Sequence, residues 1–159
     1  MGSRIASRVL ALFLLMPSAA LAQTSGFAGM AGSWSGSGSV TLTSGATERI
    51  RCRATYEVTP SGNTFQQSLR CTSDSYNFDL RSSVVRSGDT VSGTWSETTR
   101  NVTGGIAGRV SGNQIQAAIQ GPGFSANLGL ATQGDRQTVS IRSQGTELSA
   151  VSIVLRRGG

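Results

Sequence analysis

The sequence predicts an all-β protein, a single antiparallel up-and-down meander of about 8–10 strands that closes into a small barrel. Three observations predict this class. Apolar and polar residues alternate with period two from Ser33 to the C-terminus. Short turn clusters rich in Gly, Asn and Asp separate the alternating segments, and no segment shows the 3.6-residue period of an amphipathic helix.

Each alternating segment is interpreted as one strand, because residues two apart on a strand face the same side of a sheet. The apolar residues that share a face are, in chain order, Trp34, Val40 and Leu42; Ile50, Cys52, Ala54, Tyr56 and Val58; Phe65, Leu69 and Cys71; Tyr76, Phe78, Leu80 and Val84; Val91, Gly93 and Trp95; Ile106, Gly108 and Val110; Ile115, Ala117 and Ile119; Phe124, Ala126, Leu128 and Leu130; Val139 and Ile141; and Val151, Ile153 and Leu155.

The turn clusters at 60–63, 87–89, 111–113 and 134–135 set the topology. Gly, Asn and Asp tolerate the positive φ that tight hairpins require. Connections this short make neighbouring strands antiparallel, because a parallel crossover needs a dozen or more residues. A meander of this length removes its exposed edges by closing on itself.

The N-terminus has the three parts of a cleavable export signal. Arg4 and Arg8 precede an apolar run at 9–16, and Ala20 and Ala22 place small residues two apart before a cleavage site near Ala22. The alternatives are a membrane anchor or a buried helix, but the run is shorter than the roughly 20 residues of a membrane span. We expect a signal peptide at 1–22, a flexible segment at 23–32 and a barrel domain at 33–157, located in the periplasm or secreted.

The two cysteines test the strand assignment. If Ser61 and Gly62 form the centre of a hairpin, Cys52 faces Cys71 on the apolar face. An exported protein meets an oxidising compartment, so a structural disulfide is expected, with two free buried thiols as the alternative. A two-residue turn would place the pair at a hydrogen-bonded site with Cα atoms about 5.5 Å apart, and a longer loop would change the site type.

Composition excludes most catalytic chemistry. The chain contains no His and no Lys, so a Ser-His-Asp triad, a Cys-His pair, a Ser-Lys dyad and Schiff-base chemistry are absent from it. No set of residues has the spacing of a zinc site. The carboxylates at Asp74, Asp79, Glu97, Asp135 and Glu147 are interpreted as solvated acids rather than a hydrolytic pair. We therefore expect no enzyme, no cofactor and no metal site.

An outer-membrane barrel would also show alternating strands. Such strands take about 9–11 residues and carry aromatic girdles at both interfaces. Here aromatic residues are few, and the chain ends on Arg156, Arg157 and two glycines. A barrel that is not an integral membrane protein is therefore favoured.

Gly32-Ser33-Trp34 at the start of the first strand resembles the Gly-x-Trp that opens lipocalins and related calycin barrels. The resemblance implies that Trp34 packs beneath an Arg from the last part of the barrel and closes one end. Arg142, Arg156 and Arg157 are the candidates for that role. The alternative is a core tryptophan that follows a flexible glycine.

The precursor carries a net charge of +6, supplied entirely by arginine. Arg49, Arg51 and Arg53 alternate on the polar face of the second strand. In the hairpin register, Arg53 lies opposite Arg70, and Arg49 lies opposite Asp74. Arg51, Arg53 and Arg70 are candidates for an anion site, because guanidinium groups match phosphate and carboxylate. The alternative is a solvated arginine face.

Two functions follow from these features. The first is an exported barrel that binds a small apolar or lipid-like ligand, since barrels of about eight strands hold one small ligand. Glycines at Gly36, Gly38, Gly93 and Gly108 share the inward parity and either leave space for it or only permit strand bending. The second is a surface interaction or inhibitor-type envelope protein whose arginine face meets an anionic partner. Nucleic acid is not an expected partner.

Overall fold

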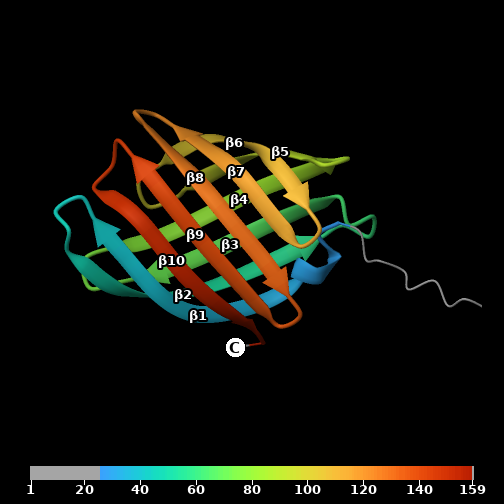
Figure 1. Ribbon diagram of the computed structural model, residues 1–159, viewed down its shortest axis with the longest axis horizontal. Coiled ribbons are helices and arrows are strands. Elements are labelled where there is room, and N and C mark those ends of the chain that lie inside the picture. Colours follow the sequence, from blue (N-terminus) through green and yellow to red (C-terminus); the bar gives the residue numbers. More distant parts are fainter. Residues whose placement is uncertain (1–25, 159) are drawn as a thin grey trace, which may run out of the picture.

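Ten strands pair with their neighbours in sequence, and the last strand pairs with the first (Figure 1). The computed structural model describes residues 26–158, so the expected signal at 1–22 lies outside the described residues. The strands are β1 (Gly32–Leu42), β2 (Thr47–Val58), β3 (Thr64–Thr72), β4 (Asn77–Ser87), β5 (Thr90–Glu97), β6 (Val102–Ser111), β7 (Gln114–Gly121), β8 (Phe124–Gln133), β9 (Arg136–Gln144) and β10 (Leu148–Arg157). All pairs are antiparallel, which confirms the expected closed barrel.

The barrel is flattened into two layers. Figure 1 shows β7–β10 in front of β2–β4, with the two groups of strands crossing at a large angle. Short connections link the strands, as at Gly112-Asn113 between β6 and β7. Gly112 has φ +57° whereas Asn113 is not among the positive-φ residues, the combination of a type II′ turn, in which glycine takes the first central position.

Alternate residues of each strand face the interior. The buried set is almost entirely apolar and includes Trp34, Val40, Ile50, Tyr56, Phe65, Val84, Val110, Ile115, Leu130, Ile153 and Leu155. Outward positions are mainly Arg, Ser, Thr and Gln, and Val85 is the one large hydrophobic side chain that is exposed among residues 26–158. Within the same range, no helix has the length and apolar character needed to cross a bilayer.

The hairpin register expected for β2 and β3 is confirmed. Val58 pairs with Phe65 and Cys52 with Cys71, and the two cysteines form a disulfide. The connection is longer than two residues, because the Thr59 N–H donates to the Thr64 carbonyl at 3.0 Å. The bridge therefore lies at a non-hydrogen-bonded pair, and its Cα atoms are 4.1 Å apart instead of about 5.5 Å.

The inward glycines do not leave space in the barrel. A Cβ atom at Gly36 would lie 1.9 Å from the Val154 carbonyl oxygen, and one at Gly38 would lie 1.8 Å from that of Ser152. The corresponding contacts at Gly93 and Gly108 are each 2.1 Å, also to a backbone oxygen of the neighbouring strand. These glycines therefore permit strand bending, the alternative considered above, because they allow neighbouring strands to approach closely where the sheet bends.

The segment before β1 packs against the barrel. Residues 26–32 belong to the segment expected to be flexible, but a 3-10 helix, η1 (Ala28–Met30), forms there. Phe27 is 1% exposed and its ring contacts Phe65 edge-on at 4.8 Å. Its N–H donates to the Gly62 carbonyl at 2.7 Å. The difference arises because Phe27 and Met30 are apolar side chains that cover the interior of the barrel at this end.

Candidate functional site

One end of the barrel is closed around Trp34, at the end that η1 covers. The Trp34 Nε1–H donates to the Met30 carbonyl at 2.8 Å. The Arg157 guanidinium lies over the indole ring, 4.3 Å from its centroid, and donates to the carbonyls of Ala31 and Gly29. A cation over an indole face is attracted by the ring quadrupole. An arginine of the last strand therefore ties the start of the first strand to η1.

The residue over Trp34 is Arg157 rather than Arg142 or Arg156. Arg156 takes the outward parity of β10, and its Nη1 lies 3.4 Å from the Asp135 carboxylate. Arg142 is exposed on β9, where the inward residues have odd numbers. The pairing of β1 with β10 places Arg157 directly opposite Trp34, and this decides which arginine closes the barrel.

A belt of polar side chains crosses the interior above the closed end. Tyr56 donates its hydroxyl hydrogen to Gln137 Oε1 at 2.9 Å and accepts from Gln67 Nε2 at 2.9 Å. Gln137 Nε2 donates to Thr132 at 3.0 Å, and Ser82 donates to Gln67 at 2.9 Å. Burial raises the pKa of Tyr56 well above its usual range, so its phenol is neutral. The belt joins β2, β3 and β4 to β8 and β9 across the interior, and its members Tyr56 and Gln137 are buried.

Sequence reasoning missed this belt, although a signal for it exists. Gln67 lies between Phe65 and Leu69 on the inward parity, and Gln137 precedes Val139 and Ile141 on the same parity. A polar residue on an apolar parity needs a partner inside, because a buried polar group without a hydrogen bond is costly.

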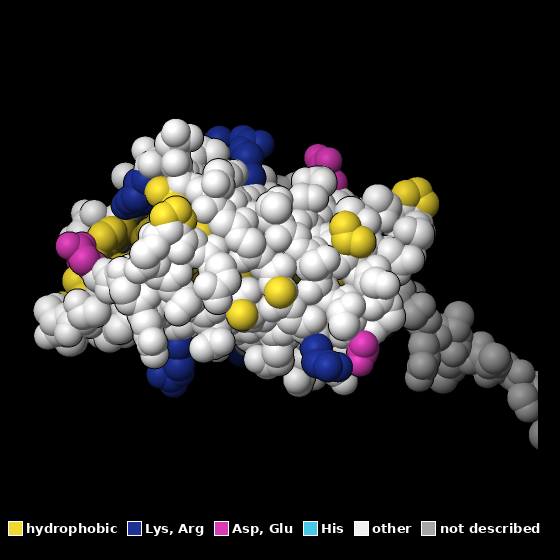
Figure 2. Space-filling view, turned by 90° about the horizontal axis from the view of Figure 1, so that it is seen from above, with side chains coloured by type: hydrophobic (Ala, Val, Ile, Leu, Met, Phe, Trp, Pro, Cys, Tyr) yellow, Lys and Arg dark blue, Asp and Glu magenta, His cyan; other side chains and the backbone are white. Residues whose placement is uncertain are grey.

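The inward apolar side chains differ between the two halves of the barrel. Around the closed end most are almost fully buried, with exposures of 7% or less at Trp34, Phe65, Leu130 and Leu155, and Val58 and Val139 are partly buried. Around the other end Val40 and Ile50 are buried, but the following inward side chains are only partly buried: Leu69, Phe78, Leu80, Ile106, Ile119, Leu128, Ile141, Leu148 and Val151. Solvent reaches these partly buried side chains from the end of the barrel opposite η1. Figure 2 shows hydrophobic side chains in view at this end, which lies on the left as in Figure 1.

Aromatic and charged side chains surround this open end. The Tyr76 hydroxyl donates to Glu147 Oε2 at 3.0 Å, which links the β3–β4 and β9–β10 connections. Tyr76 stacks on Phe78 with ring centroids 6.1 Å apart. The Arg100 guanidinium lies 5.4 Å from the centroid of Phe78. The open end therefore has a half-polar rim above an apolar interior.

Glu97 fixes the rim connection between β5 and β6. It is 6% exposed, and its carboxylate accepts from the Thr99 hydroxyl at 2.6 Å and from the N–H groups of Asp79 and Arg100 at 3.0 and 2.7 Å. Burial opposes its ionisation, but these hydrogen bonds outweigh burial and lower the pKa of Glu97 to about 2. Its oxygens are therefore occupied by the chain.

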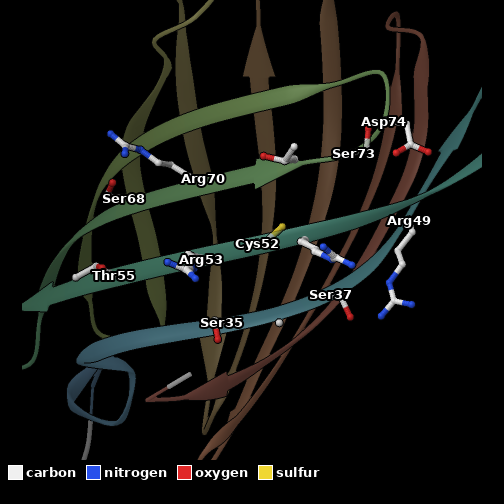
Figure 3. Close-up of a pocket in the computed structure, with 13 residues that line it drawn as sticks. Ser35, Ser37, Arg49, Cys52, Arg53, Thr55, Ser68, Arg70, Ser73 and Asp74 are labelled. Atoms are coloured by element: carbon white, nitrogen blue, oxygen red, sulfur yellow. The ribbon is translucent and has the colours of Figure 1, made fainter.

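A second concave region, the outer arginine groove, lies outside the barrel wall over β1, β2 and β3. Its volume is about 960 Å³, and arginine and hydroxyl side chains dominate its lining. Figure 3 shows Arg49, Arg53 and Arg70 on the same side of the sheet as Ser35 and Ser37. Arg51 also lines this groove, so the structure brings the three expected anion-site residues to one surface.

The acidic neighbours differ from the expected ones. Arg53 and Arg70 are directly opposed, but Arg70 Nε lies 3.1 Å from Asp79 Oδ2 on its other side. Among residues 26–158, Arg49 forms no ion pair with Asp74, because the β2–β3 pairing ends before these positions. The pairing of Arg70 with Asp79 could have been predicted from the short β3–β4 connection. This connection places Thr72 opposite Asn77 and therefore Arg70 opposite Asp79.

No group of His, Cys, Asp and Glu in the described part of the chain has the arrangement of a metal site. No protein-family model and no curated protein matches the chain by sequence. Solved structures match by fold. Rv2717c from M. tuberculosis is 13% identical with a TM-score of 0.66, and the match covers 83% of this chain and 94% of that one. The S-type phycobiliprotein lyase CPES from Guillardia theta is 10% identical with a TM-score of 0.63, covering 84% and 90%.

These likenesses show a shared antiparallel barrel architecture and assign no family. Identities this low concern the fold alone. One of the two proteins is a lyase, and one fold hosts binding proteins and enzymes alike. The expectation that this chain is not an enzyme therefore rests on its own residues.

Proposed function

We propose that this protein is exported and that the open half of its barrel binds a small apolar or lipid-like ligand. The observation that carries the proposal is the group of partly exposed inward apolar side chains on β3, β4 and β6–β10 toward the open end, whereas most inward side chains near the closed end are buried. Binding sites of this kind are concave, mostly apolar and bounded by a few polar groups.

The boundaries of this interior suit an amphiphilic ligand. Trp34 and η1 close the far end, and the buried Tyr56–Gln137 hydrogen bond ties β2 to β9 across the interior. Phe78 lines the entrance, and Arg100 and Glu147 supply charge at the rim. A ligand with an apolar body is therefore sheltered from water while a polar end reaches solvent.

Binding without catalysis remains our proposal for the chemistry. The chain has no His or Lys, and Glu97, its most buried carboxylate, already accepts hydrogen bonds from three neighbours. A general acid or base needs a titratable group free to meet its substrate. Export is supported by the disulfide, because such bridges form and persist in oxidising compartments.

Native mass spectrometry of protein purified from its own host tests the ligand and the export together. The expected spectrum shows the chain starting at Gln23 and carrying a retained mass of lipid size that is released on unfolding. A chain that retains residues 1–22 would contradict export. A ligand-free spectrum together with failure to bind an apolar fluorescent probe would contradict the binding function.

A pair of tryptophan substitutions locates the site. Leu128 faces inward and is partly buried, so Leu128→Trp adds bulk inside the barrel, whereas Val85→Trp places the same side chain on the outer surface. We expect Leu128→Trp to weaken probe binding at least about tenfold, equal to about 1.4 kcal/mol, and Val85→Trp to leave it unchanged. Equal effects of the two substitutions would place the probe outside the barrel.

A further inference from the structure

The outer arginine groove carries a positive charge that the barrel leaves unneutralised. Among residues 26–158, the guanidinium groups of Arg49, Arg51 and Arg53 form no ion pair. The neighbouring acid Glu48 turns its carboxylate to the β3–β4 connection, where it accepts from Ser73 at 2.7 Å. Like charges close together on a sheet are unfavourable, so an anion bound here relieves repulsion in addition to forming new contacts.

The three arginines form a ladder along a single strand. They occupy alternate positions of β2, so their attachment points are about 6.8 Å apart and all three side chains are exposed. One small anion reaches one or two of them. An extended chain of negative charges reaches all three at once.

Hydroxyl groups flank the ladder on both sides. On β1, Ser35 is paired with Arg53 and Ser37 with Arg51, and on β3 Thr72 is paired with Arg51. A guanidinium takes two oxygens of an oxyanion in its fork. The two unbridged oxygens of a phosphate in a chain lie on a tetrahedral phosphorus and can also accept from a hydroxyl above or below the guanidinium plane, whereas the lone pairs of a carboxylate lie in the plane of the fork. The hydroxyl rows therefore favour phosphate.

Within residues 26–158, no aromatic side chain lines the groove. Proteins that bind single-stranded nucleic acid place aromatic rings where successive bases stack. The groove offers guanidinium and hydroxyl groups, with the single carboxylate of Asp74, and without such rings it matches a phosphate chain and not the bases of a polynucleotide.

We propose that the outer arginine groove is a second binding site, which takes an extended phosphate-rich polyanion without bases along β2 through Arg49, Arg51 and Arg53. Arg70 supports one side of the groove, but its charge is shared with Asp79. This site lies on the opposite side of the barrel wall from the apolar interior, so each site is occupied independently of the other.

Binding of long-chain inorganic polyphosphate to the purified protein tests the proposal. The test variant is Arg49→Gln/Arg51→Gln/Arg53→Gln. The control, Arg109→Gln/Arg136→Gln/Arg142→Gln, removes the same charge from exposed positions on β6 and β9. We expect the β2 variant to lose at least about tenfold in affinity and the control to lose much less. Equal losses would show attraction by net charge alone and would overturn the proposal.

Salt dependence gives a second readout. With a slope of about −0.7 per neutralised phosphate, as for single strands, three contacts weaken binding about twentyfold between 50 and 200 mM salt. The β2 variant is expected to lose that part of the slope while its melting temperature stays within a few degrees of the parent. An unchanged slope in the variant would show that the three arginines do not contact the ligand.

Competing polyanions decide the ligand class. Polyglutamate and oligothymidylate of equal charge are expected to bind more weakly than polyphosphate. Tighter binding of polyglutamate would identify an acidic protein as the partner, and tighter binding of oligothymidylate would identify nucleic acid, and either result overturns the proposal. An apolar probe in the same samples reports on the barrel interior, so failure of one site is distinguished from failure of the other.

Discussion

The Cys52–Cys71 bridge is expected to contribute about 3 kcal/mol to stability. The bridged residues are 19 apart in sequence, and in the chain-entropy model a closed loop of this length costs the unfolded chain about 3 kcal/mol of freedom. Replacing both cysteines, in Cys52→Ala/Cys71→Ala, removes this constraint without leaving a free thiol. For a domain of this size each kcal/mol shifts the melting temperature by roughly 3 °C, so we expect a fall of about 10 °C.

Thermal melts followed by circular dichroism, with and without a thiol reductant, measure the effect. The parent protein is expected to lose about 10 °C in reductant, whereas the double variant melts at the same low temperature in both conditions. Some further loss accompanies the variant because both residues are buried, at 3% and 5% exposure, and Ala leaves a small cavity. Two reactive thiols in unfolded, unreduced parent protein would refute the bridge, and a melting temperature unaffected by reductant would refute its energetic role.

Three further predictions concern stability. Because the pKa of Glu97 is lowered from 4.5 to about 2, its stabilisation is complete above pH 4.5 and is lost as the pH falls toward 2, so Glu97→Gln flattens the acid limb of a stability–pH curve, and an unchanged limb would contradict this. In denaturant unfolding, Arg157→Met is expected to lower the free energy of unfolding by about 2 kcal/mol and Arg156→Met by under about 0.5 kcal/mol. Equal losses would contradict the role given to Arg157. Gly38→Ala places a Cβ against backbone and is expected to cost at least about 2 kcal/mol or prevent folding, whereas Gly105→Ala meets nothing within 4 Å, and tolerance of both would remove the close-approach argument.

Local pattern predicts much of the barrel. Period-two alternation assigns each side chain to a face, and the connections are short enough to fix which strands are neighbours. The Cys52–Cys71 pairing follows from the same logic, because the two residues are separated by a single hairpin. The actual loop is longer than the assumed one, yet the register is unchanged, since both loops are centred on Ser61 and Gly62.

Contacts between distant segments are the part that local pattern misses. The choice of Arg157 over Arg156 and Arg142 depends on the register between β1 and β10, which lie at opposite ends of the chain. The Tyr56–Gln137 hydrogen bond joins residues 81 apart. The role of Phe27 also depends on closure, because the site that buries it exists only once the barrel has an end to cover.

By itself, the sequence determined the strand faces, the neighbour order, the disulfide and the alternating arginines of β2, because each of these follows from the two-residue repeat or from one hairpin. Only the tertiary structure decided which end of the barrel is closed, where the inward side chains stay partly exposed, and which carboxylates neutralise which arginines. The physical reason is that closing a sheet fixes one register between distant strands, and that register determines which inward side chains meet and fill the interior and which outward charges become neighbours.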